Sequence, residues 1–169
     1  MRAITPARVR AGTLAPMDLR FAADTPGPPA DLFAVVADLG TYPRWLELVH
    51  RVAPAPADPG DAGPAYSVDI RARLGPLART KRLRMVRTVL EPSQRVRFER
   101  RELDGRQHAP WQLSAVVRPV GAASAVEVEL HYGGHLWGAP LEAALASHVE
   151  RAIPRLRQLV AAGAVEERP

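Results

Sequence analysis

Two arginines fall in apolar stretches of alternating sequence, where a charged side chain needs a partner. Arg87 shares the strand phase of Met85, and Arg100 continues the phase of Phe98. A charge that is buried without a partner is strongly destabilising, so each guanidinium implies a ligand, an acid or a route to solvent. Each could anchor a carboxylate, phenolate or enolate at the end of an apolar cavity. The alternative is that each reaches solvent near a sheet end or pairs with Glu102.

Aromatic and imidazole side chains supply the other polar candidates. Tyr66 and Tyr132 lie in inward phases, where a hydroxyl group can orient a ligand or donate to a developing oxyanion, although a core tyrosine with a satisfied hydroxyl group is the commoner case. Trp137 precedes a long helical pattern and could form part of a cavity rim. His108 and His148 could act as general bases at neutral pH, and we assign neither a role.

The chain carries no signature of an established enzyme class. It has no Walker-type phosphate loop, no G-x-S-x-G elbow, no H-E-x-x-H and no paired-carboxylate motif. Its lack of cysteine excludes disulfides, thiol nucleophiles and thiolate metal sites. His131 and His135 are four residues apart, but His131 ends a predicted strand and is followed by glycines, so helical convergence on a metal does not apply. We therefore expect no metal and no cofactor, and the catalytic residues, if any, are unknown.

From Tyr66 onward, apolar residues recur at every second position, which indicates strands with one buried face. Turn signals separate these strands at Gly75-Pro76, Glu91-Pro92, Asp104-Gly105 and Gly121. Short connections between successive strands predict an antiparallel meander. In the strand 78–90 the apolar phase changes between Met85 and Val86, which predicts a β-bulge or burial on both faces.

Helical patterns flank the strands. The stretch 31–39 has apolar residues at helical spacing, and Gly40 ends it. Pro43 suits the first turn of a second short helix, whose apolar side we expect to extend to Val49. From Pro140 onward, apolar residues at helical spacing predict one long helix that closes the chain.

This element order, and the stretch Asp31 to Leu46 with Tyr42-Pro43-Arg44-Trp45 in it, resemble the helix-grip fold of the START-like (SRPBCC) superfamily, specifically its polyketide cyclase/dehydrase-like members. The resemblance covers roughly residues 17–162. It implies an α+β fold in which a curved antiparallel β-sheet wraps around a long C-terminal helix, with two short helices after the first strand. We expect a single domain there, preceded by a flexible extension over 1–16 and followed by a tail over 163–169.

The resemblance also implies a cavity for an apolar small molecule between the sheet and the long helix. The molecule would be a lipid, a polyketide or an aromatic compound, and the protein would be a carrier, a sensor or a cyclase/dehydrase-like enzyme. The candidate cavity residues are the inward-phase strand and helix side chains Tyr66, Ile70, Met85, Arg87, Phe98, Arg100, Trp111, Leu113, Tyr132, Trp137, Leu145 and Val149.

The net charge of +5 comes almost wholly from arginine, and Lys81 is the only lysine. Basic residues crowd two predicted strands at Arg71, Arg73, Arg79, Lys81, Arg82, Arg84 and Arg87. We interpret them as a solvated strand face. The alternative is an anion-binding surface of a protein- or RNA-interaction module, although nucleic acid is the less favoured partner because interleaved aromatic residues are few.

No apolar stretch approaches the ~20 residues that a membrane span needs, and the N-terminal region lacks the apolar core of a secretory signal. We therefore expect a cytoplasmic protein. The sequence does not indicate its oligomeric state.

Overall fold

The computed structural model describes residues 17–74, 77–134 and 139–166, with side chains described except at 17, 72–74, 77–79, 139–146 and 164–166. In these ranges seven strands form one sheet in the order β1-β7-β6-β5-β4-β3-β2. The strands are β1 (Met17–Pro26), β2 (Val49–Pro54), β3 (Ala65–Leu74), β4 (Leu77–Glu91), β5 (Arg95–Arg100), β6 (Trp111–Val120) and β7 (Ala123–Tyr132). The helices are α1 (Pro29–Val36), the 3-10 turn η1 (Leu39–Thr41), α2 (Tyr42–Trp45) and α3 (Ala139–Glu166).

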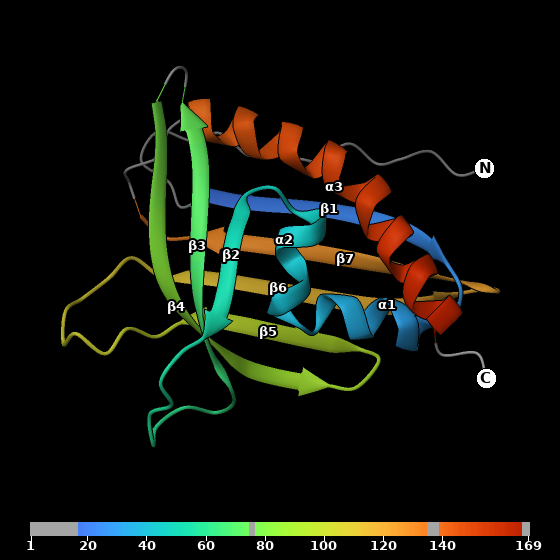
Figure 1. Cartoon of the computed structure of the whole chain (residues 1–169), viewed down its shortest axis with the longest axis horizontal. Coiled ribbons are helices and arrows are strands. Elements are labelled where there is room, and N and C mark those ends of the chain that lie inside the picture. Colours follow the sequence, from blue (N-terminus) through green and yellow to red (C-terminus); the bar gives the residue numbers. More distant parts are fainter. Residues whose placement is uncertain (1–16, 75–76, 135–138, 167–169) are drawn as a thin grey trace.

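The sheet is the antiparallel meander that the alternating pattern predicts. Strands β2 to β7 pair with their neighbours in sequence, and β1 pairs with β7. In Figure 1, β2, β3 and β4 run across the direction of β5, β6, β7 and β1, so that the sheet curls. The predicted fold class is confirmed: a curled antiparallel sheet holds a long C-terminal helix, with short helices after the first strand.

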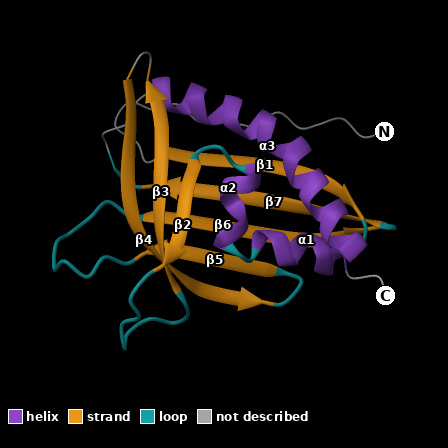
Figure 2. Cartoon of the chain, viewed as in Figure 1, coloured by secondary structure: helices purple, strands orange, loops and turns teal. Residues whose placement is uncertain are grey.

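Strand alternation gives the sheet two faces with different coverings. We call the face that carries Val68, Leu83 and Met85 the inner face, and the face that carries Asp69 and Arg84 the outer face. Helix α1 packs against β6 and β7, while α3 packs against β1, β3, α1 and α2. Figure 2 shows the three α-helices gathered on one side of the curled sheet. The helices therefore cover the inner face, as the resemblance implies.

The second short helix is shorter than predicted. Helix α1 ends at Val36 and is followed by η1, and α2 spans only Tyr42–Trp45. Val49, which we expected on the apolar side of this helix, begins strand β2 instead. Val49 has the spacing of a helix residue, but the pairing of β2 with β3, in which Val49 lies opposite Ile70, determines its conformation.

The apolar pattern of β4 changes phase between Met85 and Val86, and the strand has both of the features predicted to explain this, a β-bulge and burial on both faces. The register against β5 shifts between Arg87 and Val89. Val86, on the outer face, is only 1% exposed. Arg84 on the same face donates hydrogen bonds to Asp61 and to the carbonyl oxygen of Pro56, so the β2–β3 connection lies over this part of the strand.

Helix α3 extends to Glu166, so residues 163–166 of the expected tail belong to the helix. Its described buried residues Val149, Ala152, Leu156 and Val160 follow the predicted spacing of a helix with one apolar face. None of the helices in the described ranges is long and apolar enough to cross a membrane.

Candidate functional site

The segment from Asp38 to Val49 lies over the inner face, and short-range hydrogen bonds fix its shape. The Asp38 carboxylate accepts from the backbone N–H of Gly40 at 2.8 Å, and the Thr41 hydroxyl donates to the Val35 carbonyl at 2.7 Å. The Tyr42 hydroxyl donates to the Val36 carbonyl at 2.9 Å, and burial raises the pKa of this phenol so that it stays protonated. These bonds close the turn between α1 and α2. We call the segment 38–49 the roof.

Ion pairs tie the roof to α3. The Glu47 carboxylate lies 2.7 Å from the guanidinium of Arg155 and 3.2 Å from that of Arg151, and it is 3.4 Å from the His148 ring. Desolvation raises the pKa of Glu47, but hydrogen bonds and charge from Arg155 and Arg151 outweigh it, and the net pKa is lowered. Burial and the Arg151 charge lower the pKa of His148, so this ring is neutral at neutral pH. Opposite charges thus hold the roof against the helix.

Beneath the roof lies an apolar cavity of about 50 Å³. Its walls come from the roof, β2, β3, β4, β6 and β7, through Leu39, Leu46, Leu48, Val49, Val68, Ile70, Leu83, Met85, Trp111, Leu113 and Leu130. None of the α3 side chains described, from Ser147 to Gly163, lines it. Pockets for small molecules usually measure about 300–1,000 Å³, so a ligand of ordinary size requires this cavity to widen.

Four of the twelve predicted cavity residues, Ile70, Met85, Trp111 and Leu113, line this cavity. Tyr66, Phe98 and Val149 do not line it. Tyr66 meets the buried ring of Phe98 edge-on at 6.1 Å, next to the cavity wall, and Val149 is buried in the core on α3. The side chain of Leu145 and the whole of Trp137 lie outside the described residues.

The two candidate arginines differ. Arg100, whose side chain is only 7% exposed, pairs with Glu102 at 2.6 Å and donates to the Ala109 carbonyl at 3.3 Å. This is the pairing that the sequence left open as an alternative. Arg87 is half-buried and opposite Phe98 on β5, and no side-chain partner is described for it. Arg100 is therefore satisfied within the chain, and an anchoring role for Arg87 stays a prediction.

Sequence reasoning missed Lys81, which it grouped with a solvated face. Lys81 lies opposite Ile70, on the inner face, and its Nζ atom is 5.8 Å from the centroid of the Tyr132 ring. That ring packs against Trp111, a wall of the cavity, with 4.7 Å between centroids. Burial and the Arg100 charge lower the pKa of Lys81, against an opposing effect of Glu102. The signal was present in the sequence, since Lys81 shares the phase of Leu83 and Met85.

The predicted arginine-rich face is wrong as a single surface. Lys81 and Arg87 are on the inner face, while Arg82 on the outer face pairs with Asp69 at 2.7 Å. Arg71 is exposed on the outer face. The side chains of Arg73 and Arg79 lie outside the described residues.

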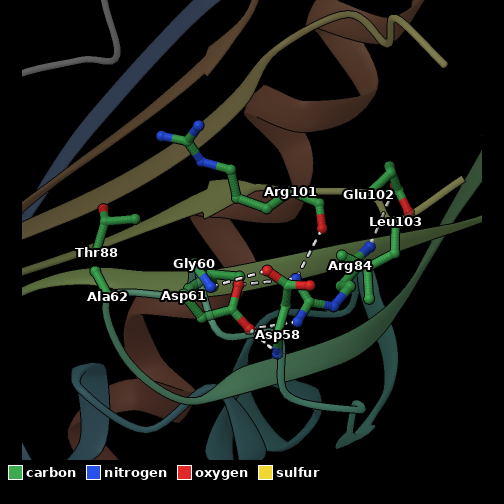
Figure 3. Close-up of a pocket in the computed structure, with 10 residues that line it drawn as sticks. Asp58, Gly60, Asp61, Ala62, Arg84, Thr88, Arg101, Glu102 and Leu103 are labelled. Atoms are coloured by element: carbon green, nitrogen blue, oxygen red, sulfur yellow. Dashed lines mark hydrogen bonds and ion pairs between the residues drawn. The ribbon is translucent and has the colours of Figure 1, made fainter. Parts of the chain in front are cut away.

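Arg84 is a buried cation on the outer face (Figure 3), and its side chain is only 9% exposed. Its guanidinium donates to both carboxylate oxygens of Asp61 and to the carbonyl oxygens of Pro56 and Arg101. These bonds lower the pKa of Asp61, with a further contribution from the backbone N–H of Asp58. The pair joins β4 to the β2–β3 connection.

A second hollow, of about 310 Å³, lies beside this ion pair (Figure 3). It is larger than the inner cavity, but its walls include Arg84, Asp58, Asp61 and Glu102, charged groups that the chain partly neutralises itself. Next to the hollow, the β2–β3 connection packs closely on β4, because a Cβ atom at Gly63 would lie 2.5 Å from the Arg87 carbonyl oxygen. We interpret the outer hollow as the margin of a structural clamp and the inner cavity as the candidate functional site.

In a comparison with protein-family models, residues 18–162 match the family described as polyketide cyclase / dehydrase and lipid transport. The chain belongs to this family. The match covers the described strands, apart from the first residue of β1, and most of α3. It agrees with the resemblance that the sequence shows.

Solved structures with the same fold have little sequence in common with this family member. A START superfamily protein from Mycobacterium smegmatis has a TM-score of 0.64 at 12% identity, over 86% of this chain and 97% of that one. The protein TTHA0849 from Thermus thermophilus has a TM-score of 0.63 at 17% identity, over 87% and 99%. Protein CV1439 from Chromobacterium violaceum has a TM-score of 0.59 at 16% identity, over 85% and 96%. At these identities they support the fold alone. No curated protein sequence matches the chain.

Proposed function

We propose that this protein binds one apolar small molecule, a lipid, polyketide or aromatic compound, in the inner cavity beneath the roof. The observation that carries this proposal is a void between the roof and the inner face that is walled wholly by apolar and aromatic side chains. An apolar void forfeits packing energy in the empty protein, so an apolar guest that fills it is stabilising.

A guest of ordinary size needs more room than about 50 Å³, and the roof and Met85 offer it. The walls on β3, β4, β6 and β7 are held by backbone ladders on both sides, whereas the roof is held by apolar packing in the core and by the partly exposed Glu47 ion pairs to α3. Met85 is unbranched and fills irregular space, so its side chain can move aside at small cost. We infer that ligand entry displaces the roof and repacks Met85.

Binding of decan-1-ol, a neutral apolar probe, tests the proposal by its effect on the melting temperature. A probe at about 100 times its Kd adds about 2.7 kcal/mol to the free energy of unfolding, which raises Tm by about 5–10 °C for a chain of this size. An Ile70→Trp variant fills the cavity from a half-buried wall position and should lose most of this increase. Its control is Arg71→Met, the next residue of β3, which faces outward and should keep it. Failure of decan-1-ol and of 1-naphthol to shift the wild-type Tm would contradict the proposal.

The same cavity suits a carrier, a sensor or a cyclase/dehydrase-like enzyme. Cyclisation of a poly-β-keto chain needs the chain to be held in a folded shape more than it needs a strong nucleophile, so an apolar cavity with few polar groups is compatible with it. The protein- or RNA-interaction alternative has less support, because Arg82 and Arg84 on the outer face are already paired with acids. Cytoplasmic location stays a prediction.

A further inference from the structure

We propose that the ligand of the inner cavity carries an anionic oxygen group, a carboxylate or an enolate, that binds at the Lys81 ammonium and the Trp111 indole N–H. This inference rests on the binding function proposed above and adds the chemical class of the ligand head.

The first support is the positive charge of Lys81, which has no carboxylate partner among the described residues. Lys81 is half-buried on the inner face, and no carboxylate within the described residues lies within ion-pair distance of its ammonium. Glu102, an acid that acts on Lys81 electrostatically, is engaged in its close ion pair with Arg100. The ammonium rests instead on the face of the Tyr132 ring, a weaker partner than a carboxylate. A partly desolvated cation without an acid is complemented by an anionic ligand.

The second support is an unused donor on Trp111, a residue of the cavity wall. The indole Nε1–H of Trp111 is buried and has no hydrogen-bond acceptor in the described part of the chain. Trp111 is 5% exposed and lines the cavity. A buried donor that lacks an acceptor is costly, and nearly all such groups in folded proteins are paired with protein or water. An oxygen atom on the ligand would satisfy it.

Both donor residues lie beside the Tyr132 ring. Trp111 packs against the Tyr132 ring at 4.7 Å, and the Lys81 ammonium lies 5.8 Å from the centroid of the same ring. Ile70, opposite Lys81 on β3, is itself a cavity wall. We infer that a ligand whose apolar part fills the cavity between Ile70 and Trp111 places its head beside the Tyr132 ring, within reach of Lys81 and the Trp111 N–H.

The nearby Arg100 strengthens the positive potential but is not the primary contact. Its guanidinium is held by Glu102 and by the Ala109 carbonyl, so a ligand would have to compete for it. Burial and the Arg100 charge also lower the pKa of Lys81, which fits an ammonium that is stabilised by an added anion. Lysine binds such a group as a point charge, and a tryptophan N–H adds direction to it.

The test compares decanoate with decan-1-ol by titration calorimetry at pH 8, at concentrations where both probes are monomeric. Wild-type protein should bind decanoate at least tenfold more tightly than decan-1-ol. Lys81→Met, a variant of similar shape, should lose this preference while its affinity for decan-1-ol stays within twofold. Lys81→Arg should keep most of the preference. Trp111→Phe should weaken decanoate binding by about three- to tenfold and leave the alcohol less affected, as expected for one lost hydrogen bond.

Arg71→Met is the matched charge control, because it removes one positive charge from the outer face of the neighbouring strand and should leave the preference intact. Equal wild-type affinity for the two probes, or a preference that survives in Lys81→Met, would overturn this inference and leave the cavity proposal standing. If the wild-type protein bound neither probe, the inference and the proposed function would fall together.

Discussion

Strand β4 carries two cations three residues apart, Lys81 on the inner face and Arg84 on the outer face, and the chain treats them in opposite ways. Around Arg84 it supplies a carboxylate and two carbonyl oxygens. Around Lys81 the described residues supply an aromatic ring and apolar walls. The outer face thus pairs Arg84 with an acid, whereas among the described residues no carboxylate lies within ion-pair distance of Lys81. The volume of a hollow alone would not have identified the inner cavity, since the outer hollow is larger.

The largest effect should come from truncating the inner wall. Leu113→Ala should lower the free energy of unfolding by about 2–5 kcal/mol, because buried methyl groups are lost and the void grows. Urea unfolding gives the value, and Leu156→Ala on α3 is a matched control that deletes the same atoms outside the cavity. Decan-1-ol should restore stability to Leu113→Ala more than to Leu156→Ala. Equal restoration in both variants would mean that the probe does not occupy the inner cavity.

Breaking the ion pair between Arg84 and Asp61 should have the second-largest effect on the free energy of unfolding. Arg84→Met leaves Asp61 without its cation and should cost about 2–3 kcal/mol, between the values for exposed and for fully buried pairs because an open hollow borders this one. Urea unfolding measures it. Replacing both partners, with Asp61→Leu added, should recover part of the loss. Affinity for decan-1-ol should not change, and a large change would contradict the separation of the two faces.

Lowering the pH should gradually remove the stabilisation that the Arg84–Asp61 ion pair provides. The pKa of Asp61 is lowered in the folded state, so its ion pair stabilises fully above the ordinary carboxyl value of 3.8 and is lost as the pH falls from there through the lower folded value. The stability difference between wild type and Asp61→Asn should therefore be constant near neutral pH and shrink below about pH 4. A difference that remained unchanged down to about pH 2.5 would show that the ionised pair does not contribute.

Removing the inner cation should have the smallest effect. Lys81→Met should change the free energy of unfolding by less than about 1 kcal/mol and favour the folded state, because the chain loses a half-buried charge that has no described acid partner. Urea unfolding beside Arg84→Met, from the same strand, gives the direct contrast. A loss of about 2 kcal/mol or more would show that Lys81 has a structural partner and would remove the reason for an anionic ligand.

Sequence reasoning was strongest where one local pattern decides the outcome. The two-residue alternation after Tyr66 gave the antiparallel sheet, and the spacing after Pro140 gave the long helix. The structure of the roof was less predictable. Val49 has the spacing of a helix residue, but it forms part of a strand because it pairs with Ile70 of β3, a contact that the local sequence does not contain. The phase break at Met85 and Val86 was readable, and both its causes are present.

The site depended on contacts that no local pattern contains. Asp61 and Arg84 are 23 residues apart, and their pairing requires the β2–β3 connection to fold over the outer face. Lys81 meets Tyr132 across the sheet, through strands that are not neighbours in sequence. A charged residue in an inward phase was the right kind of signal. We recognised this signal at Arg87 and Arg100. We overlooked it at Lys81, because the many basic residues around Lys81 suggested a solvated face.

The most direct test of the central claim is native mass spectrometry of the freshly purified protein beside its Ile70→Trp variant, followed by denaturation and extraction of any bound compound. We expect the wild-type chain to carry one apolar small molecule with an acidic oxygen group, and the variant, whose cavity is filled, to carry none. The same compound bound equally to both proteins would place the ligand outside the inner cavity and contradict the account.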